Sequence, residues 1–221
     1  LTNSALAGLI AAAIAGVLVS FILGAFTIKY WVNQVIVGVV LNSLVIGLTT
    51  FVYQEALVVN PTQLNSFAAL DNLPIPLLSA IPVLGPVLFD QNIIVYLMYV
   101  AVIAVTIGLF RTRWGLRLRS VGEHPQAADT VGINVARTRF WNVALAGGIV
   151  GVGGAWFTLG SVGPFDANIT SGAGYIALAA VIFGGWHPIR AMFAALLFGF
   201  CQYLQAAFRT SLSTAMVALF I

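Results

Sequence analysis

Charged side chains are scarce in this 221-residue chain: Asp, Glu, Lys and Arg together make up 7% of it, whereas hydrophobic residues make up 61%. About a quarter of the residues in a typical soluble domain are charged. Because so few polar side chains cannot cover a water-exposed surface, the composition predicts a membrane protein. The formal net charge of +3 does not indicate nucleic-acid binding, because the basic residues are few and lie in the loops between apolar segments.

Residue types that carry chemistry are also rare. The single cysteine, Cys201, lies in an apolar segment, which excludes a disulfide framework within the chain and a cysteine-based metal site. We interpret it as a small hydrophobic residue, with a reactive thiol as the alternative. The two histidines, His124 and His187, each precede a proline and have no cluster of metal ligands nearby.

Catalytic and nucleotide-binding motifs are missing as well. The sequence contains no Gly-x-Ser-x-Gly, no His-Glu-x-x-His and no Gly-x4-Gly-Lys-Ser/Thr segment. We therefore expect no catalytic residue, no metal site and no cofactor bound by this chain. If the protein works with ATP and Mg²⁺, a separate partner subunit is expected to bind them.

Long apolar runs are what the sequence has in abundance. About 20 apolar residues suffice for a helix to cross a ~30 Å hydrocarbon core. Runs of this length occur at 5–26, 33–53, 92–110, 140–160 and 189–208, and another begins at 212–221. The sequence predicts an all-α fold, a polytopic transmembrane helical bundle, with 1–221 as one transmembrane domain. Because the chain starts at Leu1 and stops inside an apolar run, we expect it to be truncated at both ends.

One apolar run is too short to span a membrane. It covers Tyr175 to Phe183 and is followed by Gly184, Gly185 and, three residues later, Pro188. This pattern predicts a short, broken or re-entrant helix that neighbouring helices shield from lipid. Such helices line pathways in transporters, and a purely structural hairpin is the alternative.

The basic residues indicate the orientation of the chain. Six of the nine lie between 111 and 139, and placing this loop in the cytoplasm also places Lys29 and Arg190 there, with only Arg209 outside. The loop at 54–91 contains acidic residues, no Lys or Arg, and five prolines. By the positive-inside rule, 111–139 is predicted to be cytoplasmic and 54–91 extracytoplasmic, with a short helix of the latter lying against the membrane.

Small residues recur at helical spacing in the later spans. Gly147, Gly151 and Ala155 lie four residues apart, which allows another helix backbone to approach closely. Packing within the chain and packing against a second subunit both remain open. Gly184 and Gly185 are predicted to take part in helix packing as well.

Polar residues within the spans are mostly amides, including Asn33 and Asn42, and no ionisable residue lies at the centre of a full span. Ion coupling normally requires such groups, so the pattern favours a pathway for a neutral polar solute. Hydrogen bonding between helices is the alternative role of each amide.

The centre of the basic loop contains a short segment without Lys or Arg. Pro125 suits the first position of a helix and Gly132 suits the left-handed residue that ends one, which predicts a helix over Pro125 to Val131. A helix of two turns, roughly 10 Å long, is too short to be stable alone. We therefore expect a partner to hold it through Ala127 and Ala128, with a solvated loop as the alternative.

The stretches GLRLRSVGEHPQAADTVGINVARTRFW and ALAAVIFGGWHPIRAMFAALLFG resemble ABC-importer permeases of the ribose and branched-chain amino-acid superfamily. In that family, G-x-[NH]-x-x-A-A-x-x-x-G-I marks the cytoplasmic coupling helix. The residues that match or adjoin this pattern are Gly122, Glu123, His124, Pro125, Ala127, Ala128, Gly132, Ile133 and Asn134. The segment NQVIVGVVLNSL and the acidic outer loop resemble the nucleoside permease branch most.

The resemblance implies a subunit of a bacterial importer in the cytoplasmic membrane that moves nucleosides or a related neutral solute such as a sugar. It implies cytoplasmic ABC ATPase subunits that bind ATP and Mg²⁺, a second permease subunit (identical or paralogous), and an extracytoplasmic solute-binding protein or lipoprotein. Asn33, Asn42 and Phe165 are candidates for the substrate path. An ATP-independent facilitator or channel is the alternative, and a membrane enzyme is disfavoured because no cluster of His, Asp or Glu is present.

Overall fold

The computed structural model describes residues 5–59, 72–74, 89–161 and 169–219. Its contacts divide the chain into two units, one comprising Leu1–Val100 and Leu109–Ile169 and the other Ala101–Gly108 and Thr170–Ile221. Each unit is described by itself.

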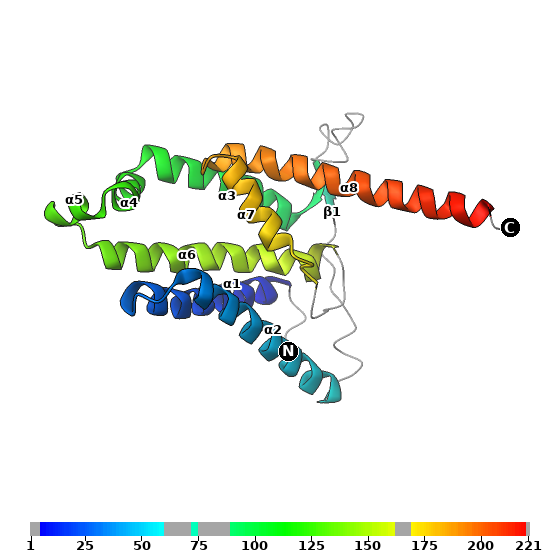
Figure 1. The fold of residues 1–221 in the computed structure, drawn as a ribbon, viewed down its shortest axis with the longest axis horizontal. Coiled ribbons are helices and arrows are strands. Elements are labelled where there is room, and N and C mark those ends of the chain that lie inside the picture. Colours follow the sequence, from blue (N-terminus) through cyan, green and yellow to red (C-terminus); the bar gives the residue numbers. More distant parts are fainter. Residues whose placement is uncertain (1–4, 60–71, 75–88, 162–168, 220–221) are drawn as a thin grey trace. The chain divides into compact units, whose positions relative to one another are not determined.

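Helices make up nearly all of the described structure (Figure 1). In chain order they are α1 (Ala5–Gly24), the π-helical turn η1 (Ala25–Lys29), α2 (Gln34–Val59), α3 (Ile93–Arg111), α4 (Arg113–Glu123), α5 (Pro125–Thr130), α6 (Val135–Trp156), the π-helical turn η3 (Phe157–Ser161), α7 (Ala173–Phe183) and α8 (Pro188–Leu219). Five segments are long and apolar enough to cross a membrane: Leu6–Lys29, Gln34–Ala56, Ile93–Arg111, Val135–Gly160 and Pro188–Arg209. The predicted all-α polytopic bundle is confirmed.

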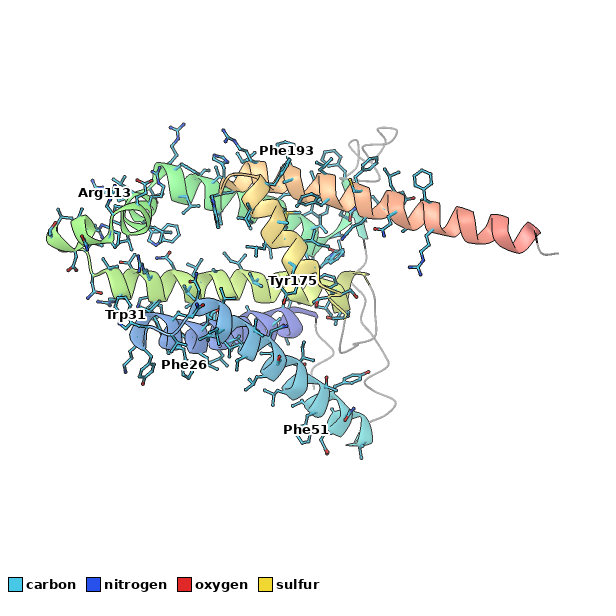
Figure 2. All side chains as sticks on the ribbon, in the orientation of Figure 1. Phe26, Trp31, Phe51, Arg113, Tyr175 and Phe193 are labelled. Atoms are coloured by element: carbon cyan, nitrogen blue, oxygen red, sulfur yellow. The ribbon has the colours of Figure 1, made fainter. Side chains whose placement is uncertain are left out.

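Large apolar side chains project outward from these helices. Phe26, Trp31 and Phe51, which Figure 2 labels, have 46%, 86% and 60% of their surface exposed. In water this surface would be strongly unfavourable, whereas lipid solvates it. The exposure is therefore what a membrane-spanning chain requires.

Two features of the predicted helix pattern were wrong. α8 continues without a break to Leu219, although a separate helix was expected from 212; Arg209, Thr210 and Ser211 are polar, but none is the Gly or Pro that would end a helix. α2 extends to Val59, into the loop predicted at 54–91. The short surface helix expected later in that loop lies outside the described residues.

The segment between α2 and α3 also contains a two-stranded antiparallel pair that the sequence pattern did not predict. β1 (Asn72–Pro74) pairs with β2 (Asp90–Asn92), with Asn72 opposite Asn92. The Tyr96 hydroxyl of α3 lies 2.9 Å from the carbonyl oxygen of Leu73 and 2.7 Å from that of Phe89. This side chain therefore fastens the pair to the start of α3.

Asn92 connects α3 to the end of the α6 span. Its side chain is 3% exposed; the Oδ1 atom accepts from the Val95 N–H at 3.3 Å, and the Nδ2 group donates to the Gly160 carbonyl oxygen at 3.3 Å. Because both the oxygen and the nitrogen of this buried amide are hydrogen-bonded, Asn92 stabilises the contact between α3 and η3. The first turn of α3 is thereby held beside η3.

The core of the first unit is a seam of small residues between α1 and α6. A methyl group placed on Gly16 would meet the Gly147 carbonyl, one on Gly151 would meet the Ala12 carbonyl, and one on Gly8 would lie 3.7 Å from Leu159. Because residue numbers rise along α1 as they fall along α6, the two helices are antiparallel. Ala155, on the same α6 face, is 8% exposed.

In the second unit, α7 and α8 form a tight hairpin. Gly184 is buried, and a methyl group on it would lie 2.6 Å from the Ala191 Cα atom. Gly185 (φ +62°) and Trp186 (φ +61°) both adopt left-handed conformations, and the Trp186 N–H donates to the Val181 carbonyl oxygen at 3.1 Å. The predicted short helix is confirmed: α7 has 11 residues, roughly 16 Å, too few to span a bilayer.

Candidate coupling site

The segment that connects α3 to α6 consists of two short helices, α4 and α5. Thr112 caps α4, because its Oγ1 atom accepts from the Gly115 N–H at 3.2 Å. On α4, Gly115 and Val121 are buried, whereas Arg113 and Arg117 are exposed. α4 is therefore an amphipathic helix that packs one face on the rest of the unit.

A sharp turn at His124 separates α4 from α5. The His124 N–H donates to the Ser120 carbonyl oxygen at 2.9 Å, while its own carbonyl oxygen accepts from the Ala128 N–H at 3.0 Å. Pro125 follows at the start of α5, where its missing N–H leaves no hydrogen bond unmade. One residue thus ends the first helix and begins the second.

The other end of α5 is closed by two backbone hydrogen bonds. The Gly132 N–H donates to Asp129 at 2.9 Å and the Ile133 N–H donates to Ala128 at 3.1 Å. Gly132 has a φ of +84°, the left-handed conformation that favours glycine. The predicted helix at Pro125 to Val131 is confirmed as α5, with Val131 as its C-cap.

Asn134 then starts α6 directly after the turn. Its Oδ1 atom accepts from the Arg137 N–H at 2.8 Å, the usual role of an N-cap residue. Arg139, one turn further on, donates from Nη2 to the Val121 carbonyl oxygen at 3.3 Å. The base of α6 is thereby tied to the end of α4, so α4, α5 and α6 form one connected structure.

The face that α5 presents differs from the one expected. Ala128 is only 3% exposed and packs inward, whereas Ala127 is exposed and Val131 is 74% exposed. Adjacent residues of a helix point about 100° apart, and here Ala128 is the one that faces the rest of the unit. The expectation that both would form the outer surface was wrong.

The exposed surface of α5 is compact and nearly uncharged. Its exposed residues are Gln126, Ala127, Asp129, Thr130 and Val131, and Glu123, His124 and Gly122 adjoin it. No ligand-binding chemistry is apparent here, and the described residues contain no group of three or more His, Cys, Asp or Glu that could hold a metal ion. A surface of this kind is suited to protein contact.

The candidate residues of the substrate path are not brought together. Asn33 is exposed, and its Oδ1 atom accepts from the Val35 N–H at 2.9 Å at the start of α2. Asn42 lies on an exposed face of α2, nine residues or roughly 14 Å further along. Phe165 lies outside the described residues.

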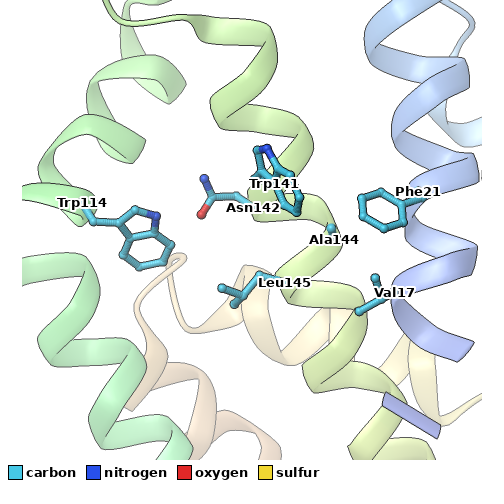
Figure 3. A pocket seen from close by; sticks show the side chains of 7 residues that line it. All are labelled: Val17, Phe21, Trp114, Trp141, Asn142, Ala144 and Leu145. Carbon is cyan, nitrogen blue, oxygen red and sulfur yellow. The ribbon is translucent and has the colours of Figure 1, made fainter. Parts of the chain in front are cut away.

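A cavity that sequence reasoning missed lies beside α4. Its volume is about 310 Å³ (Figure 3). The residues that line it are Val17, Phe21, Trp114, Trp141, Asn142, Ala144 and Leu145. Trp114 lies just inside the predicted arginine loop and Trp141 just outside it. Both are visible in the sequence, but that they line one cavity depends on the turn between α3 and α4.

The chain is similar to known transport proteins over most of its length. The family model described as "Branched-chain amino acid transport system / permease component" matches residues 1–221. The guanosine ABC transporter permease protein NupQ of Bacillus subtilis is 41% identical over 210 residues, covering 89% of this chain and 62% of the relative. The nucleoside ABC transporter permease protein NupC of Lactococcus lactis is 42% identical over 188 residues, covering 85% and 59%.

A further relative is the putative glucose ABC transporter permease protein TsgC13 of Haloferax volcanii, which is 36% identical over 78% of this chain and 52% of its own length. No solved structure matches. The chain spans about three fifths of the length of the first two relatives. With five helices that can cross a membrane and a family match along its whole length, this chain belongs to the family of branched-chain amino acid transport system permease components and is a multi-pass membrane protein.

Proposed function

We propose that this chain is the membrane-spanning part of a permease subunit in an ABC importer that moves nucleosides across the cytoplasmic membrane. The observation that carries the proposal is its 41% and 42% identity to permeases named for guanosine and nucleoside transport, each over more than four fifths of the chain. The likeness to a putative glucose permease, at 36%, makes a sugar the second candidate solute.

In this proposal α5 is the coupling helix and rests in a groove of a cytoplasmic ATPase subunit, which binds ATP and Mg²⁺. The closed ends of α5, the buried Ala128 and the hydrogen bond from Arg139 to Val121 support this role. Because of these contacts, a force applied to the exposed face of α5 would move α4 and α6 as well as α5. The helix would then transmit nucleotide-driven motion to the spans.

The remaining partners follow from the same assignment. A second permease subunit, identical or paralogous, would complete the pathway, and an extracytoplasmic solute-binding protein or lipoprotein would deliver the solute. Charged residues of the described spans lie near their ends, as Lys29, Arg111 and Arg190 do, which fits a neutral cargo. Asn33 and Asn42 stay candidates for the path.

Uptake in living cells tests the proposal. A bacterial strain that lacks nucleoside importers would express the full-length permease with its neighbouring ATPase, partner permease and binding protein. We expect uptake of labelled guanosine or another nucleoside, with inhibition by unlabelled nucleosides and not by glucose. Uptake of glucose that nucleosides fail to inhibit would establish the sugar instead, and absence of both would overturn the proposal.

A further inference from the structure

The cavity beside α4 is apolar and lies between α1, α4 and α6. Figure 3 shows Trp114 of α4 on one side of it and the α6 residues Asn142 and Leu145 facing it, with Phe21 of α1 near Trp141 on the other side. Apart from Asn142, whose amide nitrogen already donates to the Thr138 carbonyl oxygen at 2.7 Å, the lining side chains are apolar or indole rings. A hydrocarbon chain suits such a lining better than a polar solute.

The two tryptophans mark the depth of the cavity in the bilayer. Trp114 is 44% exposed and Trp141 is 58% exposed, and indole rings favour the boundary between acyl chains and headgroups. The Trp141 ring meets the Phe21 ring edge-on with centroids 6.1 Å apart, which fixes its position. A cavity lined by two indole rings therefore suits the boundary between headgroups and acyl chains.

Exposed arginines lie close in the chain to both tryptophans of the lining. Arg113 precedes Trp114 at the start of α4, and Arg137 lies one helical turn before Trp141 on α6. At 1.5 Å per residue, Arg137 is roughly 6 Å above Trp141 and roughly 12 Å above Leu145. This spacing matches the distance from a phospholipid phosphate to the upper part of its acyl chain.

The charge around the opening is strongly biased. Six arginines lie between 111 and 139, against two carboxylates, Glu123 and Asp129. Glu123 is the last residue of α4, nine residues or roughly 14 Å along the helix from Trp114, and Asp129 lies on α5. The positive-inside rule accounts for the presence of these arginines, and at the cytoplasmic surface they would attract an anionic headgroup more than a neutral one.

We propose that the cavity between α1, α4 and α6 binds an anionic phospholipid of the cytoplasmic leaflet, with an acyl chain between Trp114, Trp141 and Leu145 and the phosphate held by Arg113 and Arg137. The lipid would fill the space beneath α4, the helix that connects α5 to the spans. Its occupancy would therefore stabilise the base of the coupling site.

Brominated lipids provide a direct test, because bromine quenches tryptophan fluorescence only on contact. The full permease complex would be placed in bilayers containing either dibromo-phosphatidylglycerol or dibromo-phosphatidylcholine at equal mole fraction. We expect stronger quenching by the anionic lipid, and we expect Trp114→Phe and Trp141→Phe to remove most of that difference.

Charge variants test the headgroup. Arg113→Gln and Arg137→Gln should each weaken the preference for the anionic lipid about fivefold, the contribution of one basic residue at an anionic surface. Arg209→Gln, at the far end of the α8 span, is the matched control and should leave the preference unchanged. Glycerol phosphate in solution should not relieve the quenching, because it has no acyl chain.

Three results would overturn the proposal. Equal quenching of Trp114 and Trp141 by both lipids would show that the headgroup is not selected. Quenching of neither tryptophan by either lipid would show that another segment of the permease closes the cavity. Relief of quenching by glycerol phosphate would show a soluble phosphate site instead of a lipid site.

Discussion

Individual glycines decide how closely α1 and α6 approach. A methyl group on Gly147 would overlap Ser20 Oγ and Ser20 Cβ, and one on Gly16 would overlap the Gly147 carbonyl. Backbone atoms cannot move aside as a flexible side chain can. In lipid, where no hydrophobic force holds helices together, such close backbone contact is the main source of attraction.

We therefore expect Gly147→Val to destabilise the protein. Overpacking of a tight contact costs about 1–3 kcal/mol, which corresponds to a fall in melting temperature of about 3–10 °C for a chain of this size. The measurement is thermal unfolding of the purified permease in detergent. Gly153→Val, on the same helix at a position with nothing within 4 Å, is the control, and equal losses in both variants would contradict the packing argument.

A second residue-scale prediction concerns Gly132, whose φ is +84°. Forcing a residue with a Cβ atom into this conformation costs about 1–2 kcal/mol, so Gly132→Ala should loosen the end of α5 and reduce transport. Gly132→Asn should retain more activity, because asparagine tolerates the left-handed region better than alanine does. The measurement is nucleoside-stimulated ATP hydrolysis by the reconstituted complex, and equal activity of the two variants would argue against backbone strain.

At this scale the sequence predicts some roles and conceals others. Gly132 was predictable because a left-handed glycine is the usual end of a helix. The inward position of Ala128 was not, because a helix of six residues has too few turns to show a periodicity. The α1 side of the seam is visible in the sequence as small residues four apart: Gly8, Ala12, Gly16, Ser20 and Gly24.

Among the elements, α5 is the one whose proposed role can be tested without disturbing the fold. Ala127 is exposed, so Ala127→Arg should leave the melting temperature unchanged. Burying its unpaired charge in an ATPase groove would cost about 2 kcal/mol or more, which lowers affinity for the ATPase roughly thirtyfold or more. Co-purification of the ATPase and nucleoside uptake would both fall.

Ala136→Arg is the matched control, because Ala136 is also exposed but lies in the first turn of α6 instead of on α5. It should retain the ATPase and transport. If Ala127→Arg transported normally, the subunit would work without force transmitted through α5, as a facilitator would.

Whether a helix or strand could be predicted from the sequence depends on what causes it to form. Spans were predictable because the ~30 Å thickness of the hydrocarbon core sets their length. β1 and β2 were not, because strands of three residues are too short to show an alternation and depend on the Tyr96 hydroxyl to hold them. The continuity of α8 was not predictable from its apolar runs, because the polar residues between 208 and 212 interrupt the hydrophobicity without ending the helix.

At the scale of the whole molecule, the question is which end of the spans faces the cytoplasm. Within the first unit, the C-terminal end of α1 packs on the N-terminal end of α6, since a methyl group on Gly24 would lie 3.1 Å from the Phe140 ring. Lys29 therefore lies toward the same end of α6 as the arginines of its first turns. The hydrogen bond from Asn92 to Gly160 places Asp90 toward the other end.

The length of α6 separates these two ends by about the thickness of a membrane. The helix has 22 residues, roughly 33 Å, with Lys29 toward the end that carries its first-turn arginines and Asp90 toward the other end. The positive-inside rule therefore predicts that α5 lies in the cytoplasm and β1 outside. In a background of Cys201→Ser, we expect an impermeant maleimide added to intact cells to label Leu73→Cys, whose native side chain is 53% exposed. Gln126→Cys on α5 should be labelled only after the membrane is permeabilised. Labelling of Gln126→Cys in intact cells would show the opposite orientation, in which α5 could not contact a cytoplasmic ATPase.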